Sequence, residues 1–101
     1  MIEIVEDHGS RHQFSLKAKS GQILLTSIDF IDKNQMDIII KMLSTTPITR
    51  NHFERKTNLE GKFLFNLKDE DGNLIGTSQL YDSEMGMENG IKNLRNRLAD
   101  L

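Results

Sequence analysis

Hydrophobic and polar residues alternate in two segments, 12–18 and 63–68, where phenylalanine and leucine occupy every second position. A period of two residues is typical of a strand with one buried face. Weaker alternation over 2–6 and β-prone runs over 23–26 and 73–78 predict further strands. The pattern therefore predicts short strands in both halves of the chain.

The hydrophobic period changes to that of a helix after each set of strands. The apolar positions that share one helical face are, in order, Met36, Ile39, Ile40, Leu43, Met87, Ile91, Leu94 and Leu98. Asp32 is a suitable N-cap for the first helix, and either Asp82 or Ser83 for the second. We expect the first helix to end before Pro47.

The two halves repeat one another at an offset of 51 residues, which aligns FSLK at 14–17 with FNLK at 65–68. The same offset pairs the turn glycines Gly21 and Gly72. Between 2–43 and 53–94, 11 of 42 positions are identical, and they fall on the same kinds of element in the same order. This pattern predicts a tandem duplication.

The repeat predicts the fold class, which is α+β. Two tandem β-β-β-α repeats, residues 1–48 and 52–101, form one antiparallel sheet with two helices packed on one face. The other face of the sheet meets water. Each repeat alone is near the lower size limit for a stable fold, so residues 1–101 are expected to make a single pseudo-symmetric domain.

The residues FSLKAKSGQILLTS at 14–27 resemble the strand-turn-strand core of the YegP-like family, and GNLIGTS at 72–78 with ENGI at 88–91 resembles the same unit. That family consists of short, mostly bacterial proteins built from tandem copies of a domain of unknown function. The resemblance implies paired repeats that share a sheet, within a chain or across a dimer, and it implies no activity. DIII at 37–40 and Gly76 depart from the repeat pattern.

Composition narrows the class of protein further. The chain has 101 residues, no cysteine and a formal net charge of −2. The absence of cysteine excludes disulfides and thiolate chemistry, and the small net charge gives no strong field for nucleic acid. No segment has the length and hydrophobicity of a membrane span, and none is typical of a targeting signal. We expect a cytoplasmic protein.

Potential catalytic and ligand-binding residues each have a simpler structural interpretation. The histidines His8, His12 and His52 do not have metal-ligand spacing on strands and turns, and 69–73 lacks the glycine and glutamate positions of a calcium loop. The repeated Thr-Ser pairs at 26–27 and 77–78 are expected to bond to local backbone. We therefore assign no catalytic residue, metal site or cofactor, and expect no enzyme.

Two surfaces remain as sites of interaction. Ile38 and Met42 extend the apolar side of the first helix beyond what one sheet contact needs, which indicates either deeper packing, the favoured account, or a patch for a partner. Lys17, Lys68, Arg55 and Lys56 are predicted to share the open sheet face.

The sequence predicts a small non-enzymatic module that binds another protein or a second copy of itself. The alternative is weak nucleic-acid or anion binding through the open sheet face. Nucleic acid is the disfavoured partner, because the aromatic residues that stack on bases are on the inward register. Gly86 and Gly90 lie one turn apart in the second helix, and they indicate a close approach of its backbone to the sheet or the other helix.

Overall fold

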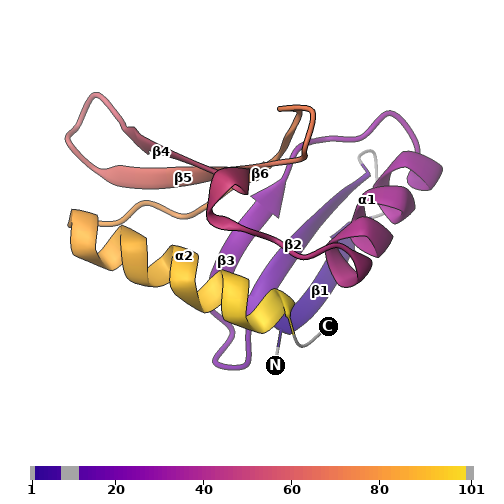
Figure 1. Cartoon of the computed structure of the whole chain (residues 1–101), viewed down its shortest axis with the longest axis horizontal. Helices are drawn as coiled ribbons and strands as arrows, with labels where there is room; N and C mark the ends of the chain where they lie inside the picture. The colour runs from indigo at the N-terminus through magenta and orange to yellow at the C-terminus, as the bar shows by residue number, and fades with distance from the viewer. Residues whose placement is uncertain (1, 8–11, 100–101) are drawn as a thin grey trace.

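A computed structural model describes residues 2–7 and 12–99. Its six strands form one sheet in the order β1-β2-β3-β6-β5-β4, and every neighbouring pair is antiparallel. The strands are β1 (Ile2–Asp7), β2 (Gln13–Ala18), β3 (Ile23–Ser27), β4 (Phe53–Thr57), β5 (Phe63–Lys68) and β6 (Leu74–Thr77). In Figure 1, β1–β3 run nearly upright while β4 and β5 run across the view, so the sheet is strongly twisted.

Two helices follow the third and sixth strands. These are α1 (Lys33–Thr45) and α2 (Glu84–Leu98). Asp32 caps α1 by accepting a hydrogen bond from the backbone N–H of Gln35, and Ser83 caps α2 in the same way from Gly86. The predicted helices and caps are confirmed. A 3-10 turn (Arg50–His52), which the sequence does not predict, leads into β4.

The two halves meet at equivalent residues. Thr26 on β3 pairs with Thr77 on β6, and these threonines stand 51 positions apart. Each half has an irregularity at the same place, between Leu16 and Lys17 in β2 and between Leu67 and Lys68 in β5. The structure therefore repeats local backbone detail at the offset that the sequence shows.

Recurrent serines join the second and third strands of each half. Ser27 Oγ accepts a hydrogen bond from the backbone N–H of Phe14 at 2.9 Å, and Ser78 Oγ accepts one from Phe65 at 2.9 Å. Each hydroxyl also donates to the backbone carbonyl of the next residue at 2.8 Å. The prediction that the Thr-Ser hydroxyls bond to backbone is confirmed for both serines and is wrong for Thr77, whose hydroxyl donates to Oδ1 of Asn66.

One hydrophobic core lies between the sheet and the helices. The core consists of the inward-facing residues of the strands, Met36 and Leu43 of α1, and the apolar side of α2. The fully buried strand residues are Phe14, Leu16, Leu25, Phe65, Leu67 and Ile75. Because both helices contribute to the same cluster, they cover the same face of the sheet, as predicted.

Gly76 differs from its counterpart in the repeat because the structure leaves no room for a side chain at position 76. A β-carbon at this position would lie 2.6 Å from the backbone oxygen of Thr26 and 3.1 Å from Cδ2 of Leu25. Leu25 is the residue that aligns with Gly76 at the 51-residue offset. Two leucines at these positions would overlap where the halves meet, so the leucine side chain of one half occupies the space left by the glycine of the other.

Candidate interaction surface

The apolar side of α1 extends from the core to the surface. Leu43 is buried, Ile39 and Met42 are half-buried against the core, and Ile38 is 66% exposed. Deeper packing, the account favoured from the sequence, therefore holds in part for α1 and is wrong for Ile38. Ile38 is placed instead on the accessible surface of the molecule.

Ile38 and Ile39 line a groove between α1 and the turn that joins β5 to β6. Two adjoining hollows, of about 370 and 250 Å³, both include these isoleucines and Asp69. The turn leads into the start of β6 and is drawn in orange in Figure 1. We call this feature the α1 groove, and we define it by Ile38, Ile39, Met42, Asp69, Glu70 and Leu74.

The wall opposite α1 is acidic. Asp69, Glu70 and Asp71 lie on the turn, and the residues that line the two hollows include no lysine or arginine among those described. Burial would raise the pKa of Asp69, but hydrogen bonds from Asn73 and from the backbone of Asp71 outweigh it and lower this pKa. The carboxylate of Asp69 thus stays ionised and fixed in the turn, while Glu70 and Asp71 are exposed.

The equivalent surface on α2 is different. The residues that align with Ile38, Ile39 and Met42 are Asn89, Gly90 and Asn93. The turn that aligns with Asp69–Asp71 is Ala18–Ser20, which carries no acid. Two departures from the repeat, an apolar helix side and an acidic turn, thus belong to the same groove. The sequence alone does not connect them, because Ile39 and Asp69 lie 30 positions apart along the chain.

The predicted basic residues do not form one patch. Arg55 pairs in the sheet with the inward residue Phe65, and its guanidinium forms a two-bond ion pair with Glu88 on α2. The prediction that Arg55 shares the open sheet face is wrong, because Arg55 follows the inward register of β4. Hydrogen bonding to Glu88 raises the pKa of Arg55 and Arg55 lowers the pKa of Glu88.

Lys68 and Lys56 lie on the open face, and both contact Glu54. The Lys68 Nζ atom is 3.1 Å and the Lys56 Nζ atom 3.9 Å from its carboxylate. Hydrogen bonds from Asn66 and then Lys68 lower the pKa of Glu54. Lys17 lies three strands from Lys68, roughly 14 Å at ordinary strand spacing. The lysines are therefore dispersed and partly neutralised.

His52 is buried and closes the 3-10 turn. Its Nδ1 accepts a hydrogen bond from the backbone N–H of Thr49 at 3.0 Å. A hollow of about 250 Å³ brings His52 together with Asp69 and Glu70. Because Nδ1 accepts this hydrogen bond, its lone pair is already engaged by Thr49 and is not free to act as a base. The arrangement explains His52 structurally.

The other histidines take no part in the groove. His12 precedes β2, its backbone pairs with Phe30, and its ring is half-buried. His8 lies outside the described residues. Within residues 2–7 and 12–99, no three potential metal ligands converge, and no helix is long and apolar enough to cross a membrane. The segment 69–73 forms a hairpin turn with Gly72 at φ +84°, as the sequence predicts.

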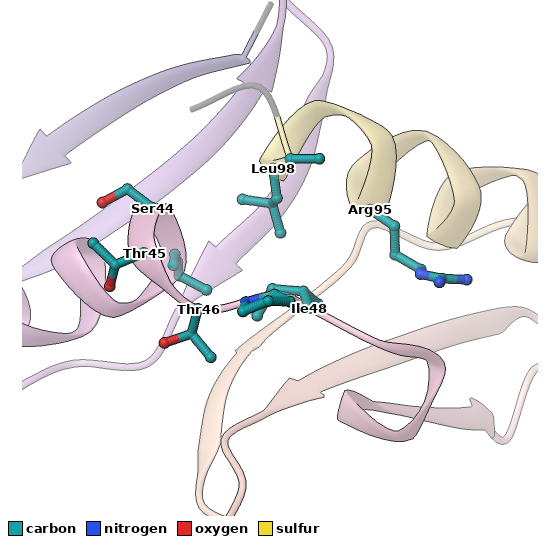
Figure 2. A pocket seen from close by; sticks show the side chains of 9 residues that line it. Ser44, Thr45, Thr46, Ile48, Arg95 and Leu98 are labelled. Atoms are coloured by element: carbon teal, nitrogen blue, oxygen red, sulfur yellow. The ribbon is translucent and has the colours of Figure 1, made fainter.

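A further hollow, of about 310 Å³, lies between the C-terminal ends of the helices (Figure 2). Ser44 and Thr45 line it, but both hydroxyls donate to the backbone oxygen of Lys41. The guanidinium of Arg95 points away from Thr46 in Figure 2. The polar groups around this hollow therefore do not converge on one point.

The fold and the groove define a small α+β module with an internal repeat and one asymmetric apolar surface. A model described as "Domain of unknown function (DUF1508)" matches residues 59–100. The chain is 34% identical to the UPF0339 protein in the ptx operon 5′ region of Stutzerimonas stutzeri, over 98% of this chain and 89% of that protein. It is 31% identical to the UPF0339 protein YegP of Escherichia coli K12, over 93% and 86%.

The chain belongs to the UPF0339 (YegP) family. Its fold matches the solution NMR structure of the protein of unknown function yegP from Escherichia coli, with a TM-score of 0.82 and 30% identity over 97% of this chain and 84% of that one. The NMR structure of UPF0339 protein SO3888 from Shewanella oneidensis matches with a TM-score of 0.80 and 29% identity, over 94% and 80%. The predicted family and fold class are confirmed.

Proposed function

We propose that this chain is a non-enzymatic module that binds a protein partner through the α1 groove. The observation that carries the proposal is the asymmetry between the helices. α2 covers the same sheet with Asn89 and Asn93 at the positions where α1 has Ile38 and Met42. The fold therefore does not require an apolar side chain at position 38, and the exposure of Ile38 on the surface supports a binding role.

The disposition of polar groups supports a binding module over an enzyme. The hydroxyls of Ser27 and Ser78 are engaged with backbone, and Nδ1 of His52 is occupied by Thr49. A nucleophile needs a base within reach, and a base needs a free lone pair. Binding through the sheet face gains less support, because Glu54 lies between Lys56 and Lys68.

Photo-crosslinking tests this function. A photoreactive phenylalanine analogue is placed at position 38 of the full chain, and as a matched control at position 89, the equivalent position on α2. We expect adducts from position 38 alone. Mass spectrometry should identify one protein in these adducts, and excess unlabelled wild-type chain should suppress their formation. An adduct of twice the chain mass would indicate self-association. Adducts that are absent, or equal at both positions, would contradict the proposal.

A further inference from the structure

The α1 groove has an apolar side and an acidic side, and this pairing restricts what can bind there. Ile38 is accessible on one side, while Glu70 and Asp71 are exposed on the other. We infer that the groove takes a cationic, amphipathic segment of a different protein, with apolar side chains against α1 and lysine or arginine beside the β5–β6 turn. This inference rests on the function proposed above.

Charge complementarity is the basis for a cationic segment. Three carboxylates lie on one turn, and no lysine or arginine is among the described residues that line the two hollows. An anionic segment would meet like charges, whereas a cationic one would gain both attraction and faster association. The apolar side of the groove would contact leucine-like side chains that recur at helical or alternating spacing in the bound segment.

The geometry favours an extended or helical segment over a small molecule. The two hollows adjoin along α1, because both include Ile38 and Ile39, and they open to solvent where Ile38 is exposed. Small-molecule sites enclose most of the ligand surface, whereas peptide grooves are lined along their length and stay open on one side.

A second copy of the chain is a poorer occupant. A two-fold contact places the same patch on both subunits, so it would bring two acidic turns, each with Asp69 to Asp71, into one interface. A contact between the groove and a basic surface elsewhere would be head-to-tail, and it would extend into rings or filaments. A segment of another protein meets neither difficulty.

Two designed peptides test the chemistry of the segment. Both are amphipathic helices of about 15 residues with leucine on one side, and the other side carries lysine in one peptide and glutamate in the other. Fluorescence anisotropy measures their binding to the full-length wild-type chain at low and at physiological salt. We expect the lysine peptide to bind at least about tenfold more tightly, with a preference that weakens as salt screens the charges.

Variants locate the binding. Replacing Ile38→Asn and Met42→Asn gives α1 the residues of α2, and should weaken the lysine peptide by about tenfold or more. Glu70→Lys with Asp71→Lys should reverse the preference toward the glutamate peptide. The matched controls, Met85→Asn for exposed hydrophobicity and Glu60→Lys for charge, lie outside the groove and should change neither affinity. Circular dichroism and thermal unfolding confirm that each variant is folded.

A second measurement does not depend on variants. Methyl NMR spectra of the wild-type chain should show the largest shifts at Ile38, Ile39 and Leu74 when the lysine peptide is added. No binding, equal binding of both peptides, or shifts centred elsewhere would overturn the inference. If adducts still form from position 38 in that case, the proposed function stands and only the chemistry of the partner is wrong.

Discussion

The ring of Tyr81 lies against the backbone of Gly90, where no side chain would fit. A β-carbon at position 90 would be 2.7 Å from Cζ of Tyr81 and closer still to its hydroxyl oxygen. The aligned residues in the first half are Phe30 and Ile39. The second half therefore combines the hydroxyl of Tyr81 with a glycine at position 90. The first half combines Phe30, which has no hydroxyl, with the side chain of Ile39.

Gly90→Ala tests this contact. Overpacking costs about 1–3 kcal/mol, and alanine returns about 1 kcal/mol in helix propensity, so we expect a net loss of about 1 kcal/mol in the free energy of unfolding. Tyr81→Phe removes the buried hydroxyl, which has no hydrogen-bond partner among the described residues. Urea denaturation of the single and double variants measures the coupling between them.

The double variant, Gly90→Ala with Tyr81→Phe, should recover part of the lost stability. The atoms that obstruct a β-carbon at position 90 belong to the Tyr81 side chain, and this variant removes the nearest of them. A coupling of about 0.5 kcal/mol or more is expected for residues in contact. Gly86→Ala is the control on the same helix, since the nearest atom to its β-carbon would be Oγ of Ser83 at 3.1 Å rather than Tyr81. Strictly additive effects at Gly90 and Tyr81 would show that the contact is unimportant.

Gly76→Ala should behave differently, because backbone blocks the new β-carbon. The Thr26 oxygen would lie 2.6 Å from it, and strands β3 and β6 would have to separate. We expect a loss of about 1–3 kcal/mol from overpacking. Leu25→Ala in the same chain should give no recovery, since the Thr26 oxygen remains. Recovery in this double variant, measured by urea denaturation, would identify the leucine as the obstacle instead.

The sequence predicts the fold well where a local pattern determines it. Alternation identifies β2 and β5. Asp32 locates the start of α1 to the residue, and the choice between Asp82 and Ser83 locates the start of α2 to within one residue. It does not predict the 3-10 turn at Arg50–His52, which depends on a bond between the His52 ring and the Thr49 backbone. That interaction has no periodic signature.

Ser78→Ala should destabilise the junction between β5 and β6. The hydroxyl accepts the backbone N–H of Phe65, and this buried donor would lose its partner at a cost of about 1–3 kcal/mol. Ser27→Ala should cost a similar amount, because Ser27 makes the equivalent bond to Phe14. Urea denaturation and amide exchange at Phe65 measure the effect. Ser44→Ala, at an exposed helical hydroxyl, should be nearly neutral, and an equal loss there would contradict the explanation.

Stability should fall in acid as the paired glutamates are protonated. Hydrogen bonding to Arg55 lowers the pKa of Glu88 below its ordinary value of 4.5 in the folded chain. A lowered folded-state pKa contributes stability above the unfolded-state value, and this contribution is lost as pH falls through the folded value. Urea midpoints measured from pH 7 down to pH 3 should therefore decline below about pH 4.5.

Glu88→Gln should make that acid decline shallower. At pH 7 its cost should stay below about 1 kcal/mol, because both side chains of the pair are over a third exposed. Glu60→Gln, which removes a carboxylate that makes no ion pair among the described residues, is the control. Identical acid profiles for Glu88→Gln and wild type would show that the Arg55 pair does not contribute.

The sequence predicts only half of the candidate site. It identifies Ile38 and Met42 from the excess of apolar residues on one helix, since helical period can be counted along the chain. It cannot show that the acidic turn at Asp69–Asp71 lies opposite them. That proximity depends on the strand order β3-β6-β5, which places the turn of the second half beside the helix of the first.

Ile38→Asn tests whether the exposed apolar side of α1 serves the fold. The side chain is 66% exposed, and the aligned residue on α2 is Asn89, so we expect the free energy of unfolding to change by no more than about 0.5 kcal/mol. Leu43→Asn is the contrasting variant, because Leu43 is 1% exposed and a buried amide would replace core contacts. It should cost about 3 kcal/mol or more. A loss of that size at Ile38 would mean that this residue stabilises the fold, and retention for binding would no longer be needed to explain it.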